Sequence, residues 1–455
     1  MADSWRGIHG RLAAFAMLAS LCAAAVFSLA AAAPVSPDAG GPGIFVSTRG
    51  DNRNDGSSPG RALRTIAAGL ARARPGDTVQ IEGGTYREQV VTVRPGDQDA
   101  EIVLRSFNGI ARIDGSALKW SSGRNQNQGL VELRHPFIRM VGLAVVNSRN
   151  TGILLDASDL TVEDCLVAET RLHGISTETR HQTRPGDEPG AMIRRITLRG
   201  NTVERAALAG RSQAVSLIAD GFLVSGNTVR DSPKEGIDIW LGSRRGSVEG
   251  NTIYGNAAVG IYVDGAAYVS ITRNTVYSNL SGIGISSEDA RYNTHDIWVF
   301  NNIVRDNRRD GVFLWDDDRK AGFRGSQNVL IAHNTLLRNG TGLRFSGGGN
   351  SGWAIGNLGY SSEQDVFFDP RHSRSVLLSG NVWLASPAGF VSLPRLDLHL
   401  GAQSLAIGRA TAIPPITTNP AINALISKDF DGNFRPAQGA DAGAFQYRRA
   451  APAGT

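Results

Sequence analysis

The sequence is poor in cysteine, with only Cys22 and Cys165 among its 455 residues. Cys22 lies in an apolar N-terminal stretch that we expect to be removed, so the mature chain keeps one cysteine and forms no internal disulfide. A disulfide framework, which stabilises many small exported domains, is therefore excluded. Stability must come from a packed core, and hydrophobic residues make up 41% of the chain.

Runs of like charge are also lacking. The formal net charge is +5, and no basic run of the kind that binds nucleic acid is present. A small positive excess suits an acidic partner such as a polyuronide, a nucleic acid or an anionic lipid, and it equally suits an ordinary soluble surface. We expect no nucleic-acid partner, no membrane partner after removal of the N-terminus, and a monomer.

The N-terminus is typical of a signal peptide. Arg6 and Arg11 precede an almost wholly apolar stretch, residues 12–32, which ends in alanines. A retained anchor is the alternative, because this run approaches membrane-spanning length. We expect residues 1–33 to be cleaved and residues 34–43 to form a short linker. The protein is then exported, either to the periplasm or to the outside of the cell.

A short phrase recurs along the chain: glycine, an apolar residue, any residue, then a second apolar residue. It begins at Gly152, Gly174, Gly236, Gly260, Gly282, Gly311 and Gly342. The spacing, about 22 to 32 residues, is typical of solenoid repeats. Strands this short cannot bury an apolar face alone, so successive coils must stack on one another.

A second phrase ends in asparagine and follows the first in most repeats. Its members are Asn201, Asn227, Asn251, Asn274, Asn302, Asn334 and Asn381. Asparagine tolerates left-handed backbone and can bond to the asparagine of the next coil. We therefore expect an all-β fold, a right-handed parallel β-helix solenoid over residues 44–385, with Asn201, Asn227, Asn251 and Asn274 stacked in one corner.

The two ends depart from the repeat. Residues 63–73 have the apolar spacing of a helix, which we expect to cap the open end of the first coil. From about Ser386 the repeat is lost and prolines are frequent, so residues 386–455 are expected to form a C-terminal capping segment.

Stacked strands turn the sequence into a surface map, because alternate residues point outward. The middle coils present Asp238, Asp264 and Glu288 on a diagonal. Residues that could bind a sugar chain surround them: Trp240, Tyr262, Trp315, His173, Glu178, Arg309 and Arg344. Rings stack on sugar faces, and carboxylates bind metals or move protons. The alternative for each carboxylate is an ordinary solvated side chain.

Lysine is rare: only four of the 47 lysine and arginine residues are lysines. One of them, Lys234, precedes the strand of Asp238. Lysine can lose its proton where arginine cannot, so Lys234 is a candidate general base. The alternative is that it only pairs with Glu235 or Asp238. Oxygen ligands from Glu235, Asp238 and Asp264 would suit Ca²⁺.

Short motifs mark both ends of the repeat region. The first end contains Phe45-Val-Ser, Asp55-Gly-Ser-Ser-Pro, Pro75-Gly-Asp77-Thr-Val and Gly84-Thr-Tyr86. The second contains Asp429-Phe-Asp431-Gly-Asn-Phe-Arg435-Pro and Asp441-Ala-Gly-Ala. They resemble the ends of secreted bacterial β-helix polysaccharide lyases of the pectate lyase-like superfamily. The resemblance implies this fold and an extracellular polysaccharide context. It does not imply a single type of reaction, because proteins with several different activities share such ends.

Cleavage of an acidic polysaccharide by β-elimination is the first hypothesis. It needs a base, here Lys234, and a cation to stabilise the uronate carboxylate, here calcium held by the three carboxylates. An inverting glycoside hydrolase is the second. One coil and two positions separate Asp238 from Asp264, so their backbones are about 8 Å apart, within the roughly 6.5–9.5 Å of inverting pairs.

Two further alternatives stay open. Alginate epimerases of this fold carry a Tyr-Gly-Phe-Asp-Pro-His motif, of which the segment Glu235–Trp240 keeps only the glycine and the aspartate. The Arg-His-Gly phrase of chondroitinase B-like lyases is also missing. The non-enzyme alternative is a β-helix that binds polysaccharide without cleaving it.

Overall fold

The computed structural model describes residues 43–119, 128–177, 192–289, 291–316, 325–369, 375–387, 389–414 and 419–448. The chain separates into two units, residues 1–39 and 40–455, and every described residue belongs to the second. The predicted signal peptide and all of the linker except Gly43 lie outside the described residues.

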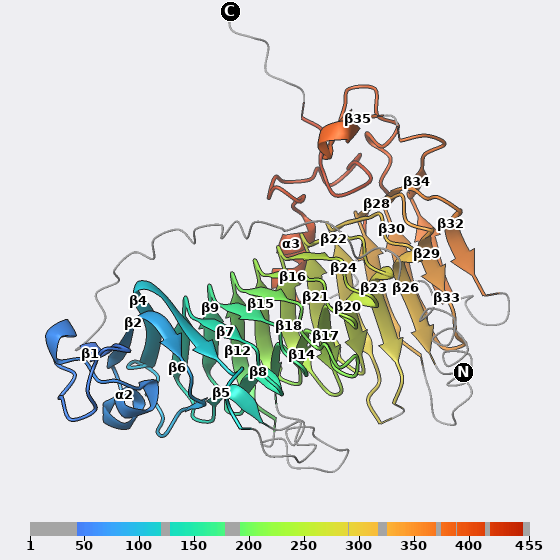
Figure 1. Cartoon of the computed structure of the whole chain (residues 1–455). Coiled ribbons are helices and arrows are strands. Elements are labelled where there is room, and N and C mark those ends of the chain that lie inside the picture. The colour runs from blue at the N-terminus through green and yellow to red at the C-terminus, as the bar shows by residue number, and fades with distance from the viewer. Residues whose placement is uncertain are drawn as a thin grey trace, which may run out of the picture. The chain divides into compact units, whose positions relative to one another are not determined.

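Parallel strands stack coil upon coil along three faces (Figure 1). The first face is an 11-stranded sheet of β3 (Val90–Val91), β5 (Gly129–Leu133), β8 (Thr151–Leu155), β11 (Ile175–Thr177), β14 (Val215–Leu217), β17 (Ile237–Trp240), β20 (Val259–Asp264), β23 (Ser281–Ser287), β26 (Asp310–Asp316), β29 (Thr341–Phe345) and β32 (Gln364–Phe368).

The other two faces are joined into one sheet, because β4 pairs with both β6 and β7. The second face comprises β1 (Gly43–Val46), β2 (Thr78–Tyr86), β4 (Ile102–Asp114), β6 (Ile138–Val141), β9 (Leu160–Glu163), β12 (Arg194–Arg199), β15 (Asp220–Ser225), β18 (Arg244–Glu249), β21 (Ala267–Thr272), β24 (His295–Phe300), β27 (Gln327–Ala332), β30 (Ser351–Ile355) and β33 (Ser375–Ser379). The third comprises β7 (Ala144–Val146), β10 (Leu166–Ala168), β13 (Thr202–Glu204), β16 (Thr228–Arg230), β19 (Thr252–Tyr254), β22 (Thr275–Tyr277), β25 (Ile303–Arg305), β28 (Thr335–Leu337), β31 (Leu358–Tyr360) and β34 (Val382–Trp383).

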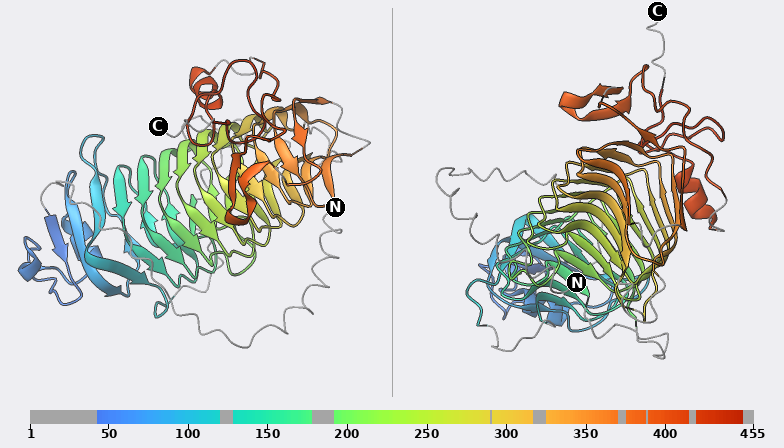
Figure 2. Two further views of the ribbon diagram at one scale, coloured as in Figure 1. Left: turned by 90° about the horizontal axis from the view of Figure 1, so that it is seen from above. Right: turned by 90° about the vertical axis from the view of Figure 1, so that its right-hand side faces the viewer.

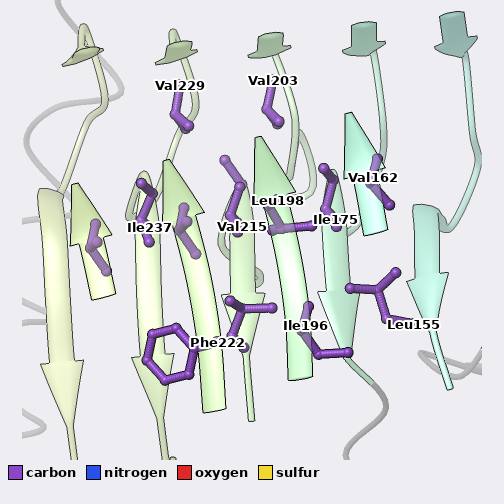
Figure 3. Packing of buried hydrophobic residues seen from close by; sticks show 14 of the residues in the cluster. Leu155, Val162, Ile175, Ile196, Leu198, Val203, Val215, Phe222, Val229 and Ile237 are labelled. Carbon is purple, nitrogen blue, oxygen red and sulfur yellow. The ribbon is translucent and has the colours of Figure 1, made fainter. Parts of the chain in front are cut away.

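The core fills the space between these faces (Figure 3). Ile175, Val215 and Ile237 follow one another in register on the first face, and all are buried. The recurring glycine has a packing reason here. A Cβ at Gly260 would lie 2.5 Å from Val276 Cγ1 and 2.9 Å from the carbonyl oxygen of Gly282, so only glycine fits where the chain enters this face.

The predicted asparagine stack is confirmed. Side-chain amides bond from one coil to the next through Asn201, Asn227, Asn251, Asn274, Asn302, Asn334, Asn357 and Asn381. The left-handed backbone, however, belongs to the residue before each asparagine, for example Gly250 and Arg273. The stacked asparagines themselves are not among the residues with a left-handed backbone, and their side-chain amides bond along the stack.

Helix α2 (Ile66–Arg72) lies within the residues for which a helix was expected. Thr65 caps its N-terminus by accepting a hydrogen bond from the backbone N–H of Ala68. A Cβ at Gly69 would lie 2.8 Å from Val46 and 2.9 Å from Val79, so the helix packs closely on β1 and β2. Its role as a cap stays a prediction. The short 3₁₀ helix η1 (Pro59–Arg61) precedes it.

The segment after the last coil contains β35 (Phe390–Ser392), η3 (Leu393–Arg395), β36 (Asp397–Leu400) and α3 (Pro420–Ile426) (Figure 2). Ile422 and Ile426 of α3 pack in one apolar cluster with Trp298 and Phe300 of β24. The described contacts of this segment are thus with the sides of coils. Its role as a cap of the last coil stays a prediction.

Arg435, from the C-terminal motif, fixes this segment to the solenoid. Its guanidinium donates to Asn301 Oδ1 at 2.9 Å and to the carbonyl oxygens of Gly443 and Ala444 at 2.8 and 3.0 Å. This motif therefore has a structural role at that point. Such a role agrees with the expectation that the end motifs indicate the fold and not the type of reaction.

Candidate functional site

The candidate site lies on the first face, where β17, β20 and β23 stack. Asp238 pairs with Tyr262, and Tyr262 pairs with Gly284, in one outward column. Trp240, Asp264 and Ser286 follow one another in the second column. The register on which the surface map depends is therefore confirmed.

These outward positions are buried, which the map did not predict. Asp238 is only 2% exposed and Asp264 only 4%. Leu154, Ser176 and Ser216, which precede Asp238 in its column, are also buried. The alternative that Asp238 and Asp264 are ordinary solvated carboxylates is therefore wrong.

In the part of the chain that the structure describes, the buried carboxyl group of Asp238 lacks a hydrogen bond at one of its oxygens. Its Oδ1 atom is buried and has no hydrogen-bond partner among the described residues, and the same is true of Oε2 of Glu235. Burial raises the pKa of Asp238 well above its ordinary value, and the charges of Glu235, Asp264 and Glu288 raise it further. Asp238 therefore keeps a proton to a higher pH than a solvated aspartate.

Asp264 has a different environment. Its Oδ1 atom accepts a hydrogen bond from the backbone N–H of Glu288 at 2.9 Å. Burial, followed by the charge of Glu288, raises the pKa of Asp264 to about 7, while hydrogen bonds from Glu288 and the Trp240 side chain oppose the shift. Asp264 can thus change its protonation state near neutral pH.

Tyr262 donates its hydroxyl hydrogen to Oε1 of Glu288. Burial raises the pKa of Tyr262 well above its ordinary value, and the charges of Glu288 and Asp264 add to the effect, so the phenol stays protonated. The ring centre lies 6.3 Å from that of Phe313. Tyr262 was expected to bind sugar through its ring, and in the structure its polar end contacts a second candidate residue.

Lys234 lies at a bend in the segment that leads into β17. Its Nζ atom is 3.6 Å from Oε1 of Glu235, and its side chain is 39% exposed. Pairing with Glu235, the alternative to a catalytic role, is thus present. A role for Lys234 as general base stays a prediction.

The predicted arginines pair with a buried carboxylate. Arg344 Nε lies 2.6 Å from Asp310 Oδ1 and Arg309 Nε lies 3.8 Å from Asp310 Oδ2. Arg344 also covers the ring of Phe367, with its guanidinium carbon 4.5 Å from the ring centre. Both arginines therefore stabilise the coil of Asp310, and their binding to substrate stays a prediction.

The remaining predicted residues are more dispersed. Trp315 pairs with Ser286, which pairs with Asp264, so Trp315 lies two coils beyond Asp264. His173 lies two coils before Glu235, with Nδ1 at 3.2 Å from the carbonyl oxygen of Gln213. Burial lowers the pKa of His173 to about 4, so this ring is neutral at neutral pH. Glu178 lies outside the described residues.

The carboxylates do not form a metal-binding set. Within the described ranges, no three or more histidine, cysteine, aspartate or glutamate side chains are grouped so that they could hold a metal ion. Glu235, Asp238 and Asp264 thus do not fit as the ligands of a calcium ion in this arrangement. Calcium binding stays a prediction.

Gly284 is a site residue that the surface map passed over. A Cβ at this position would lie 2.8 Å from Tyr262 Cδ2 and 2.7 Å from Phe313 Cε1. The missing side chain therefore leaves room for the two rings that flank it in the column. The signal was present in the sequence, because Gly284 is the only glycine at the outward position of the Gly-apolar-any-apolar phrase.

None of the helices in the described ranges combines the length and apolar character needed to cross a bilayer.

The fold has relatives of known structure, each under 25% identical. Pectate lyase Pel9A superposes with a TM-score of 0.56 at 16% identity, over 89% of this chain and 96% of that protein. The PL6 family polysaccharide lyase Pedsa3628 from Pseudopedobacter saltans gives 0.51 at 13% identity, over 76% and 97%. The GH136 lacto-N-biosidase from Eubacterium ramulus gives 0.51 at 14% identity, over 75% and 68%.

Sequence comparison gives closer likenesses. The uncharacterized protein YwoF of Bacillus subtilis (strain 168) is 30% identical over 340 residues, which are 67% of this chain and 70% of that protein. The family model described as right handed beta helix region matches residues 151–327 and 242–357. With its parallel three-faced solenoid, the chain belongs to the family of right-handed parallel β-helix proteins.

Proposed function

We propose that this protein cleaves a polysaccharide by acid–base catalysis, with Asp238 and Asp264 as the proton-transferring pair. The observation that carries the proposal is the burial of these two carboxyl groups on adjacent coils, one of them with an unpartnered oxygen. Buried carboxyls with shifted pKa values are typical of catalytic acids and bases. The polysaccharide class of the substrate rests on the likeness of fold to a pectate lyase and a PL6 polysaccharide lyase.

Hydrolysis with inversion suits this pair best. By strand spacing their backbones lie about 8 Å apart, and inverting enzymes place their two carboxyl groups about 6.5–9.5 Å apart so that a water molecule fits between them. Asp238, the more strongly protonated group, gives its proton to the glycosidic oxygen of the leaving sugar. Asp264 takes a proton from water as the water oxygen bonds to the anomeric carbon.

Product chemistry tests this proposal. The purified chain is incubated with a panel of neutral and uronate-containing polysaccharides, and new reducing ends and ultraviolet absorbance of an unsaturated uronate are both followed. New reducing ends without that absorbance support hydrolysis. A chain that binds but leaves every substrate intact would point to a binding protein instead.

Elimination from an acidic polysaccharide is the second candidate, and the place of Lys234 favours it. Its charge is near enough to Asp238 to lower the pKa of that group, although burial and the neighbouring carboxylates dominate. As a base, Lys234 would remove the C5 proton of a uronate. Lys234→Arg keeps the charge but cannot accept that proton, so a loss of about 10²–10⁴-fold, with unsaturated products from the unaltered chain, would favour elimination.

The setting of this reaction is part of the proposal. An N-terminus typical of a signal peptide implies export, so we expect the enzyme to meet its substrate in the periplasm or outside the cell. Detection of the mature chain in those fractions, starting near residue 34, would test it.

A further inference from the structure

A chain of two hydrogen bonds connects Tyr262 to Asp264. The hydroxyl of Tyr262 donates to the side chain of Glu288, and the backbone N–H of Glu288 donates to Asp264 Oδ1 at 2.9 Å. The carboxylate of Glu288 thus bonds to Tyr262, while the backbone N–H of Glu288 bonds to Asp264. The position of the Asp264 carboxyl depends on where this glutamate lies.

Gly284 makes this arrangement possible. Tyr262 pairs with Gly284 on the next coil, and Phe313 pairs with Gly284 from the other side. Because a Cβ here would lie within 3 Å of both rings, a larger residue would push the tyrosine away from the sheet. The glycine therefore lets the Tyr262 ring lie close to the sheet while its hydroxyl bonds to Glu288.

We infer that Tyr262 is a positioning residue, which fixes Asp264 through Glu288 by its hydroxyl group rather than binding substrate by its ring. The inference rests on the proposed function of Asp264. Its physical basis is geometric: a general base must be held within hydrogen-bond reach of the proton that it removes, and small displacements of such a group reduce the rate strongly.

Tyr262→Phe separates the two roles, because it keeps the ring and removes the hydroxyl. A positioning role predicts a drop in kcat of about 10-fold or more with little change in KM, as for an interaction used in the transition state. A stacking role predicts kcat and KM close to those of the unaltered chain. Tyr277→Phe on β22 is the matched control, since its ring stacks on Tyr254 on another face, and it should change neither constant.

Gly284→Ala provides a second test from the other side of the same contact. The added methyl group should displace the Tyr262 ring and lower kcat to a similar extent. Combined with Tyr262→Phe, it should cause little further loss, because both changes break the same hydrogen bond. Losses that multiply in the double variant, or an unchanged kcat in Tyr262→Phe, would overturn the inference.

A measurement of stability keeps this inference separate from the proposed function. If the unaltered chain cleaves nothing, the proposed function fails. Tyr262→Phe, Glu288→Gln and the double variant are then compared by urea unfolding. Non-additive effects support the hydrogen bond on which the positioning depends, and additive effects overturn it.

Discussion

Asn227 and Asn251 bond side chain to side chain across neighbouring coils, with Nδ2 of Asn227 2.9 Å from Oδ1 of Asn251. Asn251 also accepts from the backbone N–H of Asn227 and donates to the carbonyl oxygen of Val224 and to Asn274 Oδ1. All these groups are buried, so no water replaces a lost partner. Asn251→Ala should lower the free energy of unfolding by about 2–4 kcal/mol, since each orphaned buried group costs about 1–3 kcal/mol.

Asn381→Ala is the matched control for that experiment. It ends the described stack, where it accepts from Asn357 and donates only to the carbonyl oxygen of Ala354. Urea unfolding followed by circular dichroism should give a smaller loss than for Asn251→Ala. Equal losses would mean that the bonds within the stack do not add to coil stability.

Asp264→Asn should reduce the rate of cleavage by about 10²–10⁴-fold, the usual contribution of a positioned acid or base. The amide is nearly the same size but cannot accept a proton from water. Asp316→Asn is the comparison, because Asp316 lies on the same sheet and accepts from the backbone N–H groups of Gly348 and Gly349. A full rate in Asp264→Asn would remove Asp264 from the mechanism.

The rate should depend on pH near neutrality. Burial and then the charge of Glu288 raise the pKa of Asp264 to about 7. As the base, Asp264 must be ionised, so kcat/KM should rise as pH increases from about 6 to 8. A rate that instead falls through this range would assign the acid role to Asp264.

Removal of divalent metal should leave the rate unchanged. The proposed hydrolysis uses only carboxyl groups, and Glu235, Asp238 and Asp264 are not grouped as metal ligands within the described part of the chain. Activity is therefore measured in excess EDTA and again after addition of Ca²⁺. A loss in EDTA that calcium restores would return the elimination hypothesis to first place.

The register of the coils could be predicted from the sequence because each repeat carries its own markers. Gly236 and Gly260 lie at the starts of successive strands, directly before β17 and second in β20. Asn251 and Asn274 follow at one corner, so these markers align the residues of each column. A second stack, Asn256, Asn279, Asn307 and Asn339, bonds in the same way. This second stack could also have been predicted from the sequence, because each of its members lies five residues after an asparagine of the first stack.

The surroundings of the site could not be predicted, because they depend on groups far apart in sequence. An outward position was taken as exposed, but Asp238 is buried. Arg309 and Arg344 both pair with Asp310. The alternation of side chains along a strand predicts which face a residue lies on, but not which partner a long side chain contacts. The bond between Tyr262 and Glu288 likewise needs the space above Gly284, which only the stacked coils define.

His399 connects two parts of the C-terminal segment, because each of its ring nitrogens contacts the carboxylate of a different aspartate. Its Nδ1 lies 2.5 Å from Asp397 Oδ1 and its Nε2 lies 2.8 Å from Asp431 Oδ2. Burial lowers the pKa of His399, but hydrogen bonds and charges from Asp431 and Asp397 outweigh it and raise the pKa above its ordinary value of 6.5. The charged ring thus favours the folded arrangement.

The link between β36 and the turn at Asp431 should therefore weaken with rising pH. A pKa that is higher in the folded state gives stability that is complete below the ordinary value and is lost as pH rises through the folded value. Hydrogen exchange of peptides that cover residues 397–400 and 429–434, corrected for its intrinsic pH dependence, should show declining protection from about pH 6.5 upward. His399→Gln should remove this decline, because glutamine does not titrate. Protection that declines equally in His399→Gln would show that another group controls the link.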